Sequence, residues 1–134
     1  GVFSYYMGNY DDARNYLEKA RNAKKDDAKL IIYLGRSYDA LGDTDYAATL
    51  YQTWLNGGTA DAAVYNELGL IRLRQADAGG ALSAFQTGIA LDDVNYLQSL
   101  RFNEIVAYER LFDFKTARTR MEAYLADYPG IFKI

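Results

Sequence analysis

The chain has 134 residues, with 18 acidic and 15 basic side chains, a formal net charge of −3, and neither Cys nor His. This composition excludes disulfide frameworks, thiolate zinc sites and catalysis by Cys or His. The negative charge argues against nucleic acid, whose phosphates need a basic face. Half of the residues are hydrophobic and only one is Pro, which is typical of a single compact helical domain.

Apolar residues recur at three- and four-residue steps, and short turn signals separate the segments that carry them. In residues 28–41, for example, Ile31, Leu34, Tyr38 and Leu41 form one apolar stripe. In chain order we predict paired helices at 1–7 and 10–22, 28–41 and 44–56, 61–75 and 78–90, and 96–111 and 114–127. The fold class is therefore expected to be all-α.

Side chains that cap helix N-termini stand at or next to most of these starts, where an oxygen can accept from a free backbone N–H. They are Asn9, Asp43, Asp61, Asp77, Asn95 and Asp113. After the second pair, Asn56, Gly57 and Gly58 supply a left-handed stop.

One plan recurs four times along the chain. An Ala is followed four residues later by a large side chain, at intervals of 34, 34 and 36 residues: Ala13 with Leu17, Ala47 with Tyr51, Ala81 with Phe85 and Ala117 with Met121. Five residues before each Ala lies a turn site, occupied by Gly8, Gly42, Ala76 and Phe112. Gly35 and Gly69 interrupt apolar stripes, which predicts that a neighbouring helix approaches closely there. The two extra residues before the fourth unit lengthen either its first helix or the loop before it.

The period, the helix pair and the spaced motif resemble the tetratricopeptide repeat family. The second unit carries Leu34, Gly35, Tyr38, Ala47 and Tyr51, and the third carries Tyr65, Leu68, Gly69, Ala81 and Phe85. The fourth keeps Tyr108, Ala117 and Pro129, but Glu104 and Ile105 replace the Leu and the Gly.

This resemblance implies a right-handed superhelix, an α-solenoid of antiparallel helix pairs, forming one domain over residues 1–134. The expected units are a partial one at 1–27 and three more at 28–61, 62–97 and 98–131. Because Gly1 aligns with the middle of a first helix, we expect an N-terminally truncated array that continues at both ends. Its uncapped ends are expected to permit self-association.

In the family, the first helix of each pair lines a concave groove. The residues expected to face it are Tyr5, Tyr6, Lys29, Ile32, Arg36, Asp39, Asn66, Leu70, Leu73, Arg74, Phe102, Val106, Glu109 and Arg110. Apolar anchors mixed with hydrogen-bonding groups are typical of a peptide-binding groove. The alternative is that several of them, such as Leu70, Leu73 and Val106, pack between units. Ala63 and Glu67 stand where family members that hold a chaperone's C-terminal carboxylate need cations, so the resemblance does not extend to that subset.

The expected function is a non-enzymatic scaffold that binds a protein or peptide partner, without cofactor or metal. The acidic pairs Asp11–Asp12, Asp26–Asp27 and Asp92–Asp93 stand at helix starts or in loops. Neighbours on a helix do not face one another, so no catalytic dyad is predicted. No apolar run approaches the roughly 18 residues that span a bilayer, so no membrane insertion by this segment is expected. A peptide- or ligand-sensing regulatory domain of a larger protein and a bacterial envelope lipoprotein adaptor stay open as alternatives. A cytoplasmic and an anchored extracytoplasmic location are both compatible with the sequence.

Overall fold

The computed structural model of the chain describes residues 1–23 and 27–130. Residues 24–26, near the end of the predicted first unit, and residues 131–134, from the last residue of the predicted fourth unit onward, lie outside the described residues. Across the described part the chain forms eight helices and no strand, which confirms the all-α prediction, and the predicted bounds agree to within two residues. The helices are α1 (Val2–Tyr6), α2 (Tyr10–Ala23), α3 (Ala28–Ala40), α4 (Thr44–Asn56), α5 (Ala62–Arg74), α6 (Ala78–Ala90), α7 (Val94–Arg110) and α8 (Phe114–Asp127).

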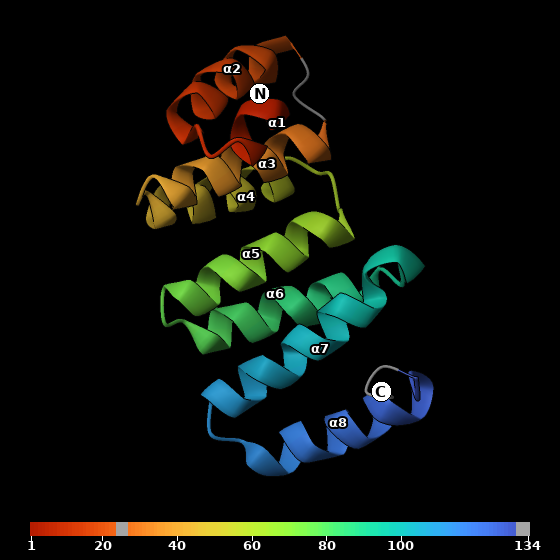
Figure 1. The fold of residues 1–134 in the computed structure, drawn as a ribbon. Helices are drawn as coiled ribbons and strands as arrows, with labels where there is room; N and C mark the ends of the chain where they lie inside the picture. Colours follow the sequence, from red (N-terminus) through yellow and green to blue (C-terminus); the bar gives the residue numbers. More distant parts are fainter. Residues whose placement is uncertain (24–26, 131–134) are drawn as a thin grey trace.

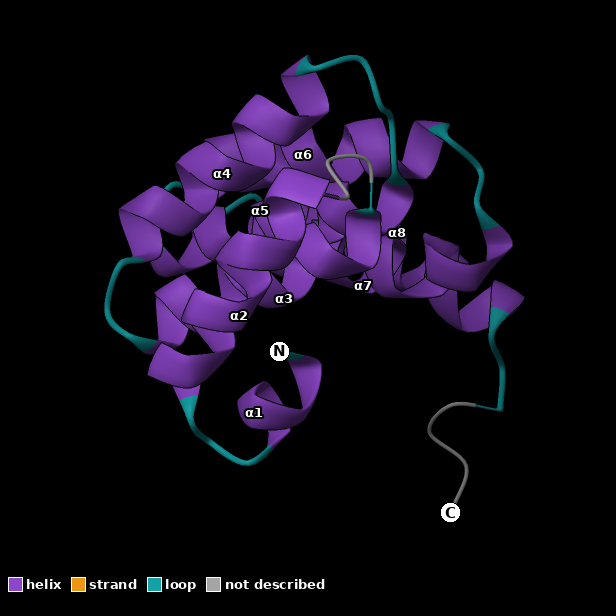
Figure 2. Cartoon of the chain, turned by 90° about the horizontal axis from the view of Figure 1, so that it is seen from above, coloured by secondary structure: helices purple, strands orange, loops and turns teal. Residues whose placement is uncertain are grey.

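The helices form antiparallel pairs that stack in chain order, from α1 and α2 at one end of the array to α8 at the other (Figure 1). Each first helix also contacts the first helix of the next pair, so α1, α3, α5 and α7 follow one another along the stack. In the view along the stack, α4 and α6 lie on one side and α3 and α7 on the other (Figure 2). The array is an α-solenoid, as predicted.

The four turn sites share one backbone conformation. The φ angles are 79° at Gly8, 92° at Gly42, and 61° at both Ala76 and Phe112. In each turn the N–H of the next residue donates to a carbonyl five residues upstream, as from Asp43 to Tyr38 at 2.8 Å, which is the bond that closes a helix C-terminus. The repeat therefore imposes the left-handed turn even where the residue is not Gly.

Most of the predicted caps are in place. Carboxylate oxygens of Asp61, Asp77 and Asp113 accept from backbone N–H groups of the first helical turn at 3.1, 2.9 and 3.2 Å. Asp43 occupies the N-cap position without a side-chain cap bond. The prediction for Asn95 was wrong: α7 begins at Val94 with Asp93 as its cap, because the helix starts earlier than the apolar pattern indicates.

The glycines inside α3 and α5 confirm the predicted close approach and identify what approaches. A Cβ at Gly35 would lie 2.2 Å from the Tyr51 ring, and a Cβ at Gly69 would lie 2.2 Å from the Phe85 ring. Both rings are fully buried. In the fourth unit Ile105 replaces the Gly, and Met121 takes the place of the ring and packs against the buried cluster that contains Ile105.

The two extra residues of the fourth unit extend α7. Compared with α3 and α5, which begin at Ala28 and Ala62, α7 begins one helical turn earlier in the repeat register, at Val94. The loop from α6 to α7 is correspondingly short, at residues 91–93. Residues of this added turn line one hollow together with residues from the N-terminal halves of α3 and α5.

Candidate functional site

A groove of about 590 Å³ runs across the first helices α3, α5 and α7. Its lining combines aliphatic, aromatic, amide, hydroxyl and charged side chains: Ala28, Lys29, Ile32, Tyr33, Arg36, Asp61, Ala63, Asn66, Glu67, Asn95, Tyr96 and Ser99. We call this the first-helix groove. Of the residues that the sequence predicted for such a surface, it brings together Lys29, Ile32, Arg36 and Asn66.

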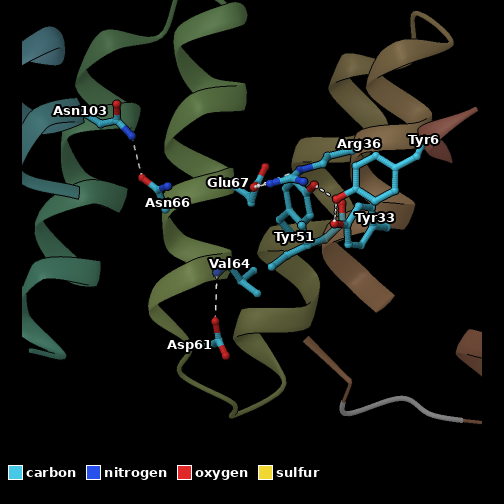
Figure 3. Close-up of polar contacts among 10 residues, drawn as sticks. Tyr6, Tyr33, Arg36, Tyr51, Asp61, Val64, Asn66, Glu67 and Asn103 are labelled. Atoms are coloured by element: carbon cyan, nitrogen blue, oxygen red, sulfur yellow. Dashed lines mark hydrogen bonds and ion pairs between the residues drawn. The ribbon is translucent and has the colours of Figure 1, made fainter. Parts of the chain in front are cut away.

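The centre of the groove is held by polar contacts between neighbouring first helices (Figure 3). Arg36 donates from Nε to Oε1 of Glu67 at 3.1 Å, and its Nη2 donates to the same oxygen. The guanidinium also lies over the Tyr33 ring, 5.2 Å from its centroid. The hydrogen bond to Glu67 raises the pKa of Arg36 beyond its already high ordinary value, so this cation is permanent.

A second contact joins α5 to α7. The side-chain amide of Asn103 donates to Oδ1 of Asn66 at 2.8 Å (Figure 3). Asn66 is half-buried and lines the groove. Its carbonyl is therefore occupied by a neighbour, which fixes the orientation of its amide.

Tyrosines border the groove on the side of α1. Tyr5 and Tyr6 contact Tyr33 with ring centroids 5.3 and 5.6 Å away, and the hydroxyl groups of Tyr6 and Tyr33 are hydrogen-bonded to each other. This hydrogen bond raises the pKa of Tyr6, and burial raises the pKa of Tyr5. The cluster supports Tyr33, which in turn supports Arg36.

The other predicted residues lie outside the groove lining. Asp39 and Arg74 form an ion pair at 3.2 Å between α3 and α5. Leu70 and Leu73 pack against the buried cluster around Phe85. Phe102 contacts Tyr124 with ring centroids 5.9 Å apart. Val106 is half-buried and Arg110 is exposed, while Glu109 lines a separate hollow at the C-terminal end with Phe114 and Met121.

Several lining residues were missed from the sequence. Tyr33 lies one helical turn after Lys29, so the spacing on α3 could have identified it. Ser99 could also have been identified, because it stands in the repeat register of Lys29. Asn95 and Tyr96 could not, since they belong to the added turn of α7. The role of Glu67 as the partner of Arg36 also depends on the distance between α3 and α5.

Another hollow, of about 430 Å³, lies between α2 and α4 and includes Ile31, Tyr46, Thr49, Leu50 and Thr53. The residues 34 positions later line a similar hollow between α4 and α6. A hollow that recurs with the repeat is explained by the packing of successive second helices. The first-helix groove, by contrast, depends on the added turn of α7, which is unique to the fourth unit among the described helices.

The described residues contain no group of three or more acidic side chains arranged to hold a metal ion. No helix among them combines the length and the apolarity that crossing a bilayer requires.

Comparisons with known proteins support the repeat assignment. A sequence model of the tetratricopeptide repeat matches residues 5–69. BBSome complex member bbs-4 of Caenorhabditis elegans is 32% identical over 120 residues, which is 90% of this chain, and the chain spans only 26% of that relative.

Two crystal structures of MamA superimpose with TM-scores of 0.80 each, at 21% and 20% identity. They cover 98% and 96% of this chain, which matches 70% and 74% of theirs. At this level of identity they establish the fold. With the repeat register and the helix pairs described above, the sequence match identifies tetratricopeptide repeats over residues 5–69, and the structural matches extend the same helical-repeat fold over the rest of the described chain. Repeats of this kind support a general role as a protein-interaction scaffold.

Proposed function

We propose that the chain is a non-enzymatic scaffold that binds an extended segment of a partner protein in the first-helix groove. The observation that carries this proposal is the convergence of three successive first helices on one hollow. Its volume lies within the range of about 300–1,000 Å³ that is typical of ligand sites. Ile32, Tyr33 and Tyr96 supply apolar surface, and Asn66, Asn95 and Ser99 supply hydrogen-bonding groups.

The mixture suits a peptide. Aromatic and aliphatic side chains anchor a ligand by burying apolar area, whereas amides pair with a peptide backbone through both a donor and an acceptor. The matched relative is named as a member of a multiprotein complex, which accords with a binding role. The ion pairs and amide contacts along α3, α5 and α7 keep these groups in place before a ligand arrives, which lowers the entropy cost of binding.

The proposal is tested with a displayed library of random peptides. Peptides enriched on the wild-type chain are measured by calorimetry against a groove variant carrying Ile32→Ser, Asn66→Ala and Tyr96→Ala. The control variant carries Tyr46→Ala and Thr53→Ala in the hollow between α2 and α4. We expect the groove variant to bind more than about tenfold more weakly, a loss of about 1.4 kcal/mol, and the control to bind like the wild type. Enrichment of no peptide, or equal binding by the groove variant, would refute the proposal.

A further inference from the structure

We propose that the first-helix groove selects internal segments of its partner over C-terminal ends. This inference rests on the proposed function, since it concerns which peptides the groove accepts. It follows from the partners that the charged side chains of the groove already have within the chain.

Two cations and two anions line the groove: Lys29 and Arg36, and Asp61 and Glu67. Arg36 directs both Nε and Nη2 at Oε1 of Glu67. The Glu67 side chain is only 12% exposed, compared with 38% for Arg36, so the pair is seated within the groove wall. Asp61 caps α5 by accepting from the N–H of Val64 at 3.1 Å.

A C-terminal carboxylate therefore meets an unfavourable environment. To reach the guanidinium of Arg36 it must displace Glu67 or lie beside it, and two carboxylates at one site repel each other. Lys29 is an exposed point charge at the first turn of α3, where water screens it. The lining of the groove consequently contains no arginine without an acidic partner, which is the group that holds a carboxylate by two parallel hydrogen bonds.

A neutral peptide backbone meets complementary groups instead. Oδ1 of Asn66 accepts a hydrogen bond from Asn103. The NH₂ group of Asn66 therefore remains as a donor for another acceptor. Glu67 uses Oε1 for Arg36, and among the described residues its Oε2 has no hydrogen-bond partner. Asn66 offers an amide donor and Glu67 a carboxylate acceptor, both in the lining of the groove, and these groups match the C=O and N–H groups that an internal peptide segment presents along its length. Arg36 and Asn103 are thus positioning residues, which hold Asn66 and Glu67 from the two neighbouring helices.

The experiment compares two formats of the same random peptide library, one with free C-terminal carboxylates and one with those ends blocked by amidation. The wild-type chain is expected to enrich peptides whose affinity does not fall when the end is blocked. Glu67→Gln should release Arg36 and shift the selection toward free carboxylates, with at least a tenfold change in the ratio of affinities. Glu122→Gln is the matched control, because it removes a carboxylate from the exposed ion pair with Arg118 and should leave the ratio unchanged.

The outcomes separate this inference from the proposed function. Peptides that bind the groove but require a free carboxylate would overturn the inference alone, as would a Glu67→Gln variant with the wild-type ratio. Failure of both formats to yield a peptide sensitive to the groove variant would overturn the proposed function and this inference with it. If Glu67→Gln does not fold, Arg36→Gln tests the same point by removing the cation: a free carboxylate should then still bind no better than a blocked end.

Discussion

Replacing Gly69 by Ala tests the packing on which the whole stack depends. The added Cβ would lie 2.2, 2.5 and 2.6 Å from three ring carbons of Phe85, whereas ordinary contact begins near 3.4 Å. The ring is fully buried, so it must move by about 1 Å into a packed core. Overpacking of this kind costs about 3 kcal/mol. Ala favours the helix by about 1 kcal/mol over Gly, which leaves an expected net loss of about 2 kcal/mol.

Gly79→Ala is the matched control. Gly79 lies in the first turn of helix α6, and a Cβ there would have no atom within 4 Å. Only the helix propensity then changes, and we expect a gain of less than about 1 kcal/mol. Urea unfolding followed by circular dichroism should therefore separate the two variants by about 2–3 kcal/mol, or roughly 7–10 °C in Tm.

A double variant decides whether the ring is the cause. Phe85→Leu shortens the obstructing side chain, so Gly69→Ala should cost less in that background than in the wild type, and the two changes should not be additive. The reasoning is refuted if Gly69→Ala is as stable as the wild type. It is also refuted if the loss is the same whether or not the ring is present, because the strain would then arise elsewhere.

Three further predictions follow from the structure. Burial raises the pKa of the Tyr51 hydroxyl above its ordinary value of 10.0. The stability that the neutral hydroxyl contributes is therefore fully present below pH 10 and is lost as the pH rises further. The midpoint of urea unfolding should decrease as the pH is raised above 10, and it should decrease less steeply in Tyr51→Phe. Ala76→Gly and Phe112→Gly should each raise the unfolding free energy by about 0.5–1 kcal/mol, because both residues hold a φ of 61°; a lower urea midpoint would contradict this. Phe3 is 78% exposed at a register position that is buried in the other three units, so Phe3→Ser should weaken the concentration-dependent self-association that we propose for the open end. Sedimentation showing a monomer at all concentrations would contradict that proposal.

The fold was predictable because every unit repeats the same local pattern. Four turn sites, four small residues and four large ones specify the helix pairs, and the family motif specifies how pairs stack. Even the substitutions are consistent with the pattern, since Phe112 adopts the same left-handed turn as Gly8 and Gly42. The start of α7 was misplaced by two residues, because the interval of 36 residues allowed either a longer helix or a longer loop.

The groove was predictable only in part, for a physical reason. Helical spacing identifies which residues share a face, and it placed Lys29, Ile32, Arg36 and Asn66 on the surface that the structure shows as hollow. Spacing does not give the distance between side chains of different units. The pairing of Arg36 with Glu67, 31 positions apart, depends on how closely α5 stacks on α3, and that distance is set by side chains buried on the other face.

The added turn of α7 connects the irregularity of the repeat to the proposed site. If α7 began at the same register position as α3 and α5, Asn95 and Tyr96 would stand in the loop before it. The extra turn instead places both residues on a helix, at the wall of the groove opposite Lys29 and Arg36. A regular array offers similar surfaces at every step, whereas this one gathers its amide, hydroxyl and aromatic groups where the interval changes. Ligand binding by a chain of repeats is therefore expected to concentrate at the position where the repeat is broken.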